Sequence, residues 1–119
     1  MALVSGNADL KIDQGSTWEQ PIYFTSSELD LSVTGLDAEI TIRKCTDEDI
    51  ILNTGNGKIV IDDVNNKLDC YLSYEETKRF TKNGTWKLEI IYPATESSPE
   101  ERFTYLTGQI IIKRDITEI

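Results

Sequence analysis

The stretch that decides the fold of this 119-residue chain is residues 84–114, which opens with the letters GTWKLEIIY at 84–92. From Trp86 onward every second residue is apolar, which is the period of a half-buried strand. Pro93 ends this strand, because proline cannot donate a hydrogen bond within a sheet. A polar connection then leads into a second extended run at 103–113. The stretch predicts a long β-hairpin, which needs further strands to cover its apolar face.

Short extended segments bounded by turn residues recur through the rest of the chain. Pro21 makes segment 17–25 an edge strand or a bulged strand. The Asn56-Gly57 pair predicts a hairpin between segments 50–53 and 58–62, since both residues tolerate a left-handed backbone. The segments are residues 9–14, 17–25, 37–45, 50–53, 58–62 and 67–72.

One segment carries a helical signal. Ser73 and Glu76 have the spacing of a capping box, which predicts one or two helical turns over 74–80, bridging two sheets. About eight short strands with this helix predict an all-β fold, an antiparallel, immunoglobulin-like β-sandwich. A half-open barrel is the alternative. Residues 1–119 are expected to form a single domain, with 1–7 and 115–119 as frayed tails.

The charge balance limits the classes of partner. The chain has 12 Lys and Arg against 21 Asp and Glu, a formal net charge of −9. Nucleic acids and anionic membranes attract clustered basic residues, so a basic partner fits this chain better. Histidine is absent, which removes the commonest general base and metal ligand. No signal peptide is readable, and the chain is expected to start in a reducing cytoplasm.

Cys45 and Cys70 are therefore expected to be free thiols. Cys70 alternates with Leu68 and Leu72, which places it in an apolar layer. Cys45 lies next to Lys44 and is the more reactive candidate, because basic surroundings favour the thiolate. A structural role is favoured for both, as free cysteine is commonly buried.

Two other groups of residues invite a chemical interpretation. Trp18 and Trp86 could stack on sugars, but their strand faces are otherwise aliphatic or aromatic, which favours core packing. Four oxygen-bearing side chains surround one turn without the spacing of an EF-hand, so an Asx-rich turn is favoured over a bound cation. They are Asp62, Asp63, Asn65 and Asp69.

Four apolar or aromatic residues are predicted to point away from the inward-facing set. One interpretation is that the helix or residues 26–34 cover them. The other is that they form a protein–protein contact surface, because monomers seldom expose large apolar patches. The four candidate site residues are Tyr71, Ile91, Tyr105 and Ile111.

Three parts of the chain resemble a known group of proteins. Residues 10–18 read LKIDQGSTW, similar to an opening strand, a Gln-Gly turn and a second strand. Residues 30–44 are similar to an Asp-Leu-Thr-Gly turn and the strand that follows it. The third part comprises residues 72–77, 84–90 and 106–112. Together they resemble small β-sandwich proteins of phage and prophage tail modules, including the N-terminal domain of baseplate upper proteins.

The resemblance implies a non-enzymatic structural or assembly component of a phage or prophage tail or baseplate. It implies contacts with other virion proteins or with copies of the chain itself. No small-molecule substrate, cofactor or metal is expected, and the net charge argues against nucleic acid or a membrane as a partner. None of the matched motifs is catalytic, so no active-site residue is implied. The expected location is the host cytoplasm during assembly and then the virion tail. A carbohydrate- or receptor-binding module of the virion is the alternative.

Overall fold

The computed structural model describes residues 6–25, 27 and 29–113. Within these residues the chain forms nine strands and one short helix. In chain order they are β1 (Gly6–Asn7), β2 (Leu10–Asp13), β3 (Trp18–Tyr23), β4 (Asp37–Arg43), β5 (Ile50–Asn53), β6 (Ile59–Asp62), β7 (Lys67–Leu72), α1 (Tyr74–Lys78), β8 (Gly84–Tyr92) and β9 (Glu101–Lys113).

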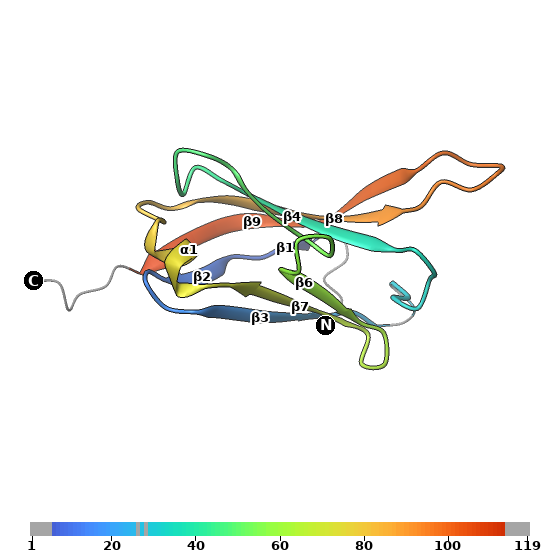
Figure 1. Ribbon diagram of the computed structural model, residues 1–119, viewed down its shortest axis with the longest axis horizontal. Coiled ribbons are helices and arrows are strands. Elements are labelled where there is room, and N and C mark those ends of the chain that lie inside the picture. Colours follow the sequence, from blue (N-terminus) through green and yellow to red (C-terminus); the bar gives the residue numbers. More distant parts are fainter. Residues whose placement is uncertain (1–5, 26, 28, 114–119) are drawn as a thin grey trace, which may run out of the picture.

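The strands form two facing sheets (Figure 1). The six-stranded sheet has the order β1-β9-β8-β4-β5, with β2 also paired to β9, and the three-stranded sheet has the order β3-β7-β6. β1 and β2 run parallel to β9, whereas the other pairs are antiparallel. The prediction of a purely antiparallel fold is therefore wrong at this edge. The reason is that β2 leads into β3 of the opposite sheet instead of folding back as its hairpin partner.

The predicted all-β class is confirmed: strands dominate the structure and form two sheets, with one small helix. The six-stranded sheet curls into a half-barrel. A curled sheet of this kind is what the alternative prediction, a half-open barrel, requires.

The core lies between the sheets and uses alternate residues of each strand. On β8, Trp86, Leu88 and Ile90 are buried, as the alternation predicted. Their partners Ile40 and Ile42 on β4 are buried as well. Burying one such side chain contributes about 1.5–3 kcal/mol, so this layer alone is a large part of the driving force for folding. The three-stranded sheet adds Trp18, Ile22, Ile59, Leu68, Cys70 and Leu72.

The N-terminal edge is more ordered than the sequence predicted. Gly6 and Asn7, assigned to a frayed tail, form β1 beside β9. Between β1 and β2 the Ala8 N–H donates to the Thr107 carbonyl at 2.9 Å. A Cβ on Gly108 would lie 1.7 Å from the Ala8 carbonyl oxygen, so this approach requires glycine. The other predicted tail residues, 1–5 and 115–119, lie outside the described residues.

β5 and β6 are not hairpin partners, which corrects the prediction from Asn56-Gly57. β5 pairs with β4 in one sheet, and β6 pairs with β7 in the other. The turn itself forms, with Gly57 at φ 77°. However, Asn56 Nδ2 donates to the Ile51 carbonyl at 2.8 Å, and Asn56 Oδ1 accepts from the Asn53 N–H at 3.1 Å. Asn56 thus bonds the backbone of β5 itself, and the turn carries the chain from one sheet to the other.

The predicted capping box is confirmed at α1. Ser73 Oγ accepts from the Glu76 N–H at 3.3 Å, and Glu76 Oε1 accepts from the Ser73 N–H at 3.1 Å. Glu76 also forms an ion pair with Lys58. Burial acts to raise the pKa of Glu76, but the hydrogen bonds from Lys58 and Ser73 outweigh it and hold the pKa below its usual value. As predicted, α1 links a strand of one sheet to a strand of the other.

Asn66 fixes the long connection between β3 and β4. Its backbone is left-handed (φ 53°) at the turn before β7. Its Nδ2 donates to the carbonyls of Phe24 (2.7 Å) and Leu29 (2.9 Å), and its Oδ1 accepts from the Leu31 N–H (3.0 Å). Leu29 and Leu31 are buried, so the connection covers one end of the core.

Candidate functional site

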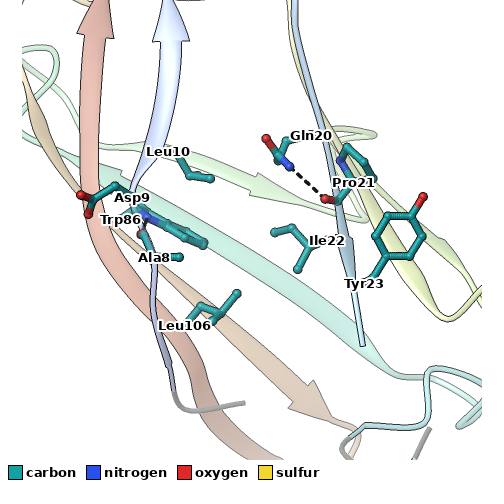
Figure 2. A pocket seen from close by; sticks show the side chains of 9 residues that line it. All are labelled: Ala8, Asp9, Leu10, Gln20, Pro21, Ile22, Tyr23, Trp86 and Leu106. Carbon is teal, nitrogen blue, oxygen red and sulfur yellow. Dashed lines mark hydrogen bonds between the residues drawn. The ribbon is translucent and has the colours of Figure 1, made fainter. Parts of the chain in front are cut away.

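A pocket of about 300 Å³ opens between the edges of the two sheets (Figure 2). One wall is the segment from Ala8 to Leu10, and the other is residues 20–23 of β3. β3 is an edge strand, as Pro21 predicted. Figure 2 shows Leu10 and Ile22 turned toward the space between the walls, with Trp86 beside them.

The pocket has an apolar floor and a polar rim. Trp86 is only 3% exposed, and its Nε1 donates to the Ala8 carbonyl at 2.8 Å, so its one polar atom is already bonded. At the rim, Asp9 Oδ1 accepts from the Gln109 N–H at 3.2 Å, and Gln20 Nε2 donates to the Pro21 carbonyl at 3.0 Å. The volume is at the lower end for ligand sites. Such a pocket can hold one apolar group, with Asp9 and Tyr23 among the residues that line it.

The four predicted site residues do not form one surface. Tyr71 is 43% exposed but lies on β7, on the outer face of the three-stranded sheet. Ile91 and Ile111 both lie on the six-stranded sheet. Ile91 pairs with Arg102, nine residues from Ile111 along β9, so the two side chains are roughly 30 Å apart.

Ile91 alternates with the inward-facing residues of β8, so it points to the outer side of the sheet, as predicted. It is nevertheless buried, at 7% exposed. Arg102, its partner on β9, reaches across β8 to Glu39 on β4 at 3.4 Å. Arg102 also lies 3.8 Å from Glu89 in the same ion-pair network. An ion-pair network therefore crosses this face beside Ile91, where an open apolar surface was predicted. Ile111 is half-buried.

Tyr105 points to the inner side, which contradicts the alternation that predicted it outside. Leu88 pairs with Leu106 and Glu89 with Thr104, so Tyr105 is the extra residue of a β-bulge. A bulge reverses the alternation on one side of itself. Tyr105 packs edge-on against Phe24, with ring centroids 6.1 Å apart. Burial, with a hydrogen bond to Tyr92, raises the pKa of Tyr105 to about 12.

Three of the exposed large apolar side chains lie on one face of the three-stranded sheet. Tyr23 (56% exposed), Val60 (57%) and Tyr71 come from its three strands and share its outer face. We call these three residues the outer patch. The pairing places Tyr71 opposite Glu19, and Val60 opposite Asp69, which in turn faces Pro21. The sequence alternation could have predicted this exposure, because Tyr23 and Val60 alternate with the inward-facing Ile22 and Ile59.

Both cysteines are buried, so the predicted difference in reactivity between them is absent. Cys45 and Cys70 are free thiols, 1% and 2% exposed. Burial raises the pKa of Cys45 to about 11 and that of Cys70 to about 12. Both are therefore protonated at neutral pH, and the burial expected of them is confirmed.

The acidic turn is an Asx turn, as predicted. Asp62 Oδ1 accepts from the N–H groups of Val64 and Asn65, both at 3.1 Å, and Asp62 Oδ2 accepts from Asn65 Nδ2 at 2.9 Å. These hydrogen bonds, above all those from Asn65, hold the pKa of Asp62 below its usual value. Asp69 instead pairs with Lys67 at 3.3 Å. In the described part of the chain, no three acidic or cysteine side chains are grouped as metal ligands would be.

No protein-family model matches the chain, and no curated protein matches it. Among the described residues, no helix is long and apolar enough to cross a membrane.

Proposed function

We propose that this chain is a non-enzymatic structural or assembly component of a bacteriophage or prophage tail or baseplate. It acts through contacts with other virion proteins, first in the host cytoplasm during assembly and then in the tail. The motif resemblance at residues 10–18, 30–44 and 106–112 supports this class of protein. We further propose that the two-sheet fold is of the immunoglobulin-like type.

The observation that carries the proposal is the outer patch. Two tyrosines and a valine are exposed on adjacent strands, on a sheet face that no other element in the described chain covers. Exposed aromatic residues on a rigid sheet are typical anchors of protein interfaces, because they bury a large area at low entropic cost.

The charges around the outer patch indicate the sign of the partner. Glu19, Asp62 and Asp69 lie on the same sheet face, where Lys67 is the cross-strand partner of Asp62. Lys67 is already engaged with Asp69, and its Nζ lies 5.7 Å from the centre of the Tyr23 ring. With three carboxylates around one ammonium, and a net charge of −9 overall, the patch fits a partner with basic residues around an apolar centre.

The double variant Val60→Lys with Tyr71→Lys tests the outer patch. Both side chains are exposed, so the melting temperature should change little, since surface substitutions usually cost within about 0.5 kcal/mol. Incorporation into tail particles should fall at least about tenfold, because interface anchors are desolvated and the new charges repel a basic partner. The measurement is the amount of chain per particle, by quantitative mass spectrometry.

Val64→Lys is the matched control. Val64 is 88% exposed in the β6–β7 turn, and the same charge there should leave incorporation unchanged. Undiminished incorporation of a folded double variant would contradict the role of the outer patch.

A carbohydrate- or receptor-binding module is the second candidate, favoured by the two exposed tyrosine rings on one face. Both tryptophans are buried, so tryptophan fluorescence would not report sugar stacking on this face. The suitable readout is the ring signals of Tyr23 and Tyr71 in an NMR titration with host-surface glycans. Saturable shifts confined to these rings would favour the sugar binder over the assembly protein.

A further inference from the structure

Among the described residues, no strand pairs with the outer edge of β9 at the end of the β8–β9 hairpin. Residues 101–105 of β9 pair with β8 on one side. On the other side, β1 begins to pair only at Leu106, and no strand in the described chain lies beside 101–105. Figure 1 shows this end of the hairpin extending beyond the rest of the six-stranded sheet. Such an edge is a template for pairing with another strand.

At two other strands at sheet edges, backbone groups of the edge are missing or already bonded. On β3, Pro21 has no N–H, and its carbonyl accepts from Gln20 Nε2. On β5, the Ile51 carbonyl and the Asn53 N–H are both bonded to Asn56. In the part of the chain that the structure describes, no side chain bonds the backbone of residues 101–105 in this way.

We propose that two copies of this chain pair antiparallel through residues 101–105 of β9. A two-fold axis at Phe103 places Phe103 opposite its counterpart, Arg102 opposite Thr104, and Glu101 opposite Tyr105. No like charges face each other directly, which is the requirement for a stable cross-strand register. The segment is therefore complementary to itself, as a two-fold interface demands.

Phe103 is the side chain that gains most from this pairing. It is 46% exposed and makes an edge-on contact with Tyr92, with ring centroids 5.7 Å apart. It shares the inner face of the sheet with Ile90, its partner on β8. Opposed across the two-fold axis, the two Phe103 rings would cover each other and extend the aromatic row from Tyr92. The five-residue length of the interface is set by β1, which occupies the edge from Leu106 onward.

This self-association does not depend on what binds the outer patch, which lies on the other sheet. The parent chain should show, in sedimentation equilibrium over a dilution series, a mass that approaches twice 13.5 kDa at the higher concentrations. A single mass of one chain throughout would overturn the proposal.

Two substitutions at Thr104 test the register, since its side chain is exposed and faces the partner's Arg102. Thr104→Lys places like charges opposite each other at two symmetric positions, and should weaken the dimer at least about tenfold. Thr104→Glu, of the opposite charge, should retain it or strengthen it. Equal effects of the two substitutions would overturn this register, and Val64→Lys should leave the dimer unchanged.

The chain's own residues 1–5 are the competing occupant of this edge, because they directly precede β1. Deleting them distinguishes the two cases. If the parent is monomeric and the shortened chain dimerises, the chain's own N-terminus occupies the edge and the proposal is wrong. If both dimerise equally and Thr104→Lys dissociates both, the second copy is the occupant.

Discussion

Replacing Trp86 with alanine is expected to lower the free energy of unfolding by about 3–5 kcal/mol. Trp86 is 3% exposed, lies in the central layer opposite Ile42, and is bonded through Nε1 to the Ala8 carbonyl. The substitution leaves a cavity and an unpaired carbonyl. Because a whole domain has only about 5–15 kcal/mol of stability, the variant should be close to unfolding in urea titrations.

Trp86→Phe separates the two contributions. It keeps a six-membered aromatic ring but removes the pyrrole part of the indole with its N–H, so the expected cost is about 1–3 kcal/mol for the orphaned Ala8 carbonyl and the smaller side chain. Tyr74→Ala, at an exposed aromatic of α1, is the control and should change stability by no more than about 0.5 kcal/mol. A Trp86→Ala protein as stable as the Tyr74→Ala protein would contradict the central position of Trp86.

Replacing Gly108 with alanine is expected to cost at least about 3 kcal/mol, at the upper end for overpacking. The new Cβ would lie 1.7 Å from the Ala8 carbonyl oxygen and 2.9 Å from Trp86 Nε1. The segment joining β1 to β2 must move away, and it takes the Trp86 hydrogen bond with it. Thermal unfolding of the purified variant should show a melting temperature lower by roughly 10 °C or more.

Gly55→Ala is the matched glycine control. Gly55 lies in an exposed turn, where a Cβ would meet only the Asn53 side-chain oxygen, at 3.3 Å. Its melting temperature should stay close to that of the parent. If Gly108→Ala is equally tolerated, the close approach of Ala8 to β9 does not determine the stability of this edge.

The features that the sequence predicted well are those set by local pattern. The alternation from Trp86 to Ile90 is the period of a strand with one buried face, and β8 follows it. The spacing of Ser73 and Glu76 predicts α1 because a capping box needs only three residues of chain. Pro21 predicts an edge strand because its missing N–H would break a central ladder.

The features that the sequence did not predict depend on contacts between distant residues. Tyr105 was placed on the wrong face because a single extra residue opposite β8 reverses the alternation. Asn66 has the appearance of an ordinary turn residue, yet its side chain holds carbonyls more than 30 positions away. The four residues of the predicted contact surface lie on different faces for a related reason. Alternation assigns a residue to one of the two faces of its strand, but it does not say to which of the two sheets the strand belongs.

The most direct test of the proposed function is the composition of tail particles purified from the strain that carries this chain. Quantitative mass spectrometry should find the chain at a fixed copy number relative to the other tail proteins, with copy number preserved by Val64→Lys and lost in the Val60→Lys, Tyr71→Lys variant. Particles that lack the chain altogether, while the folded protein stays free in the lysate, would contradict the account.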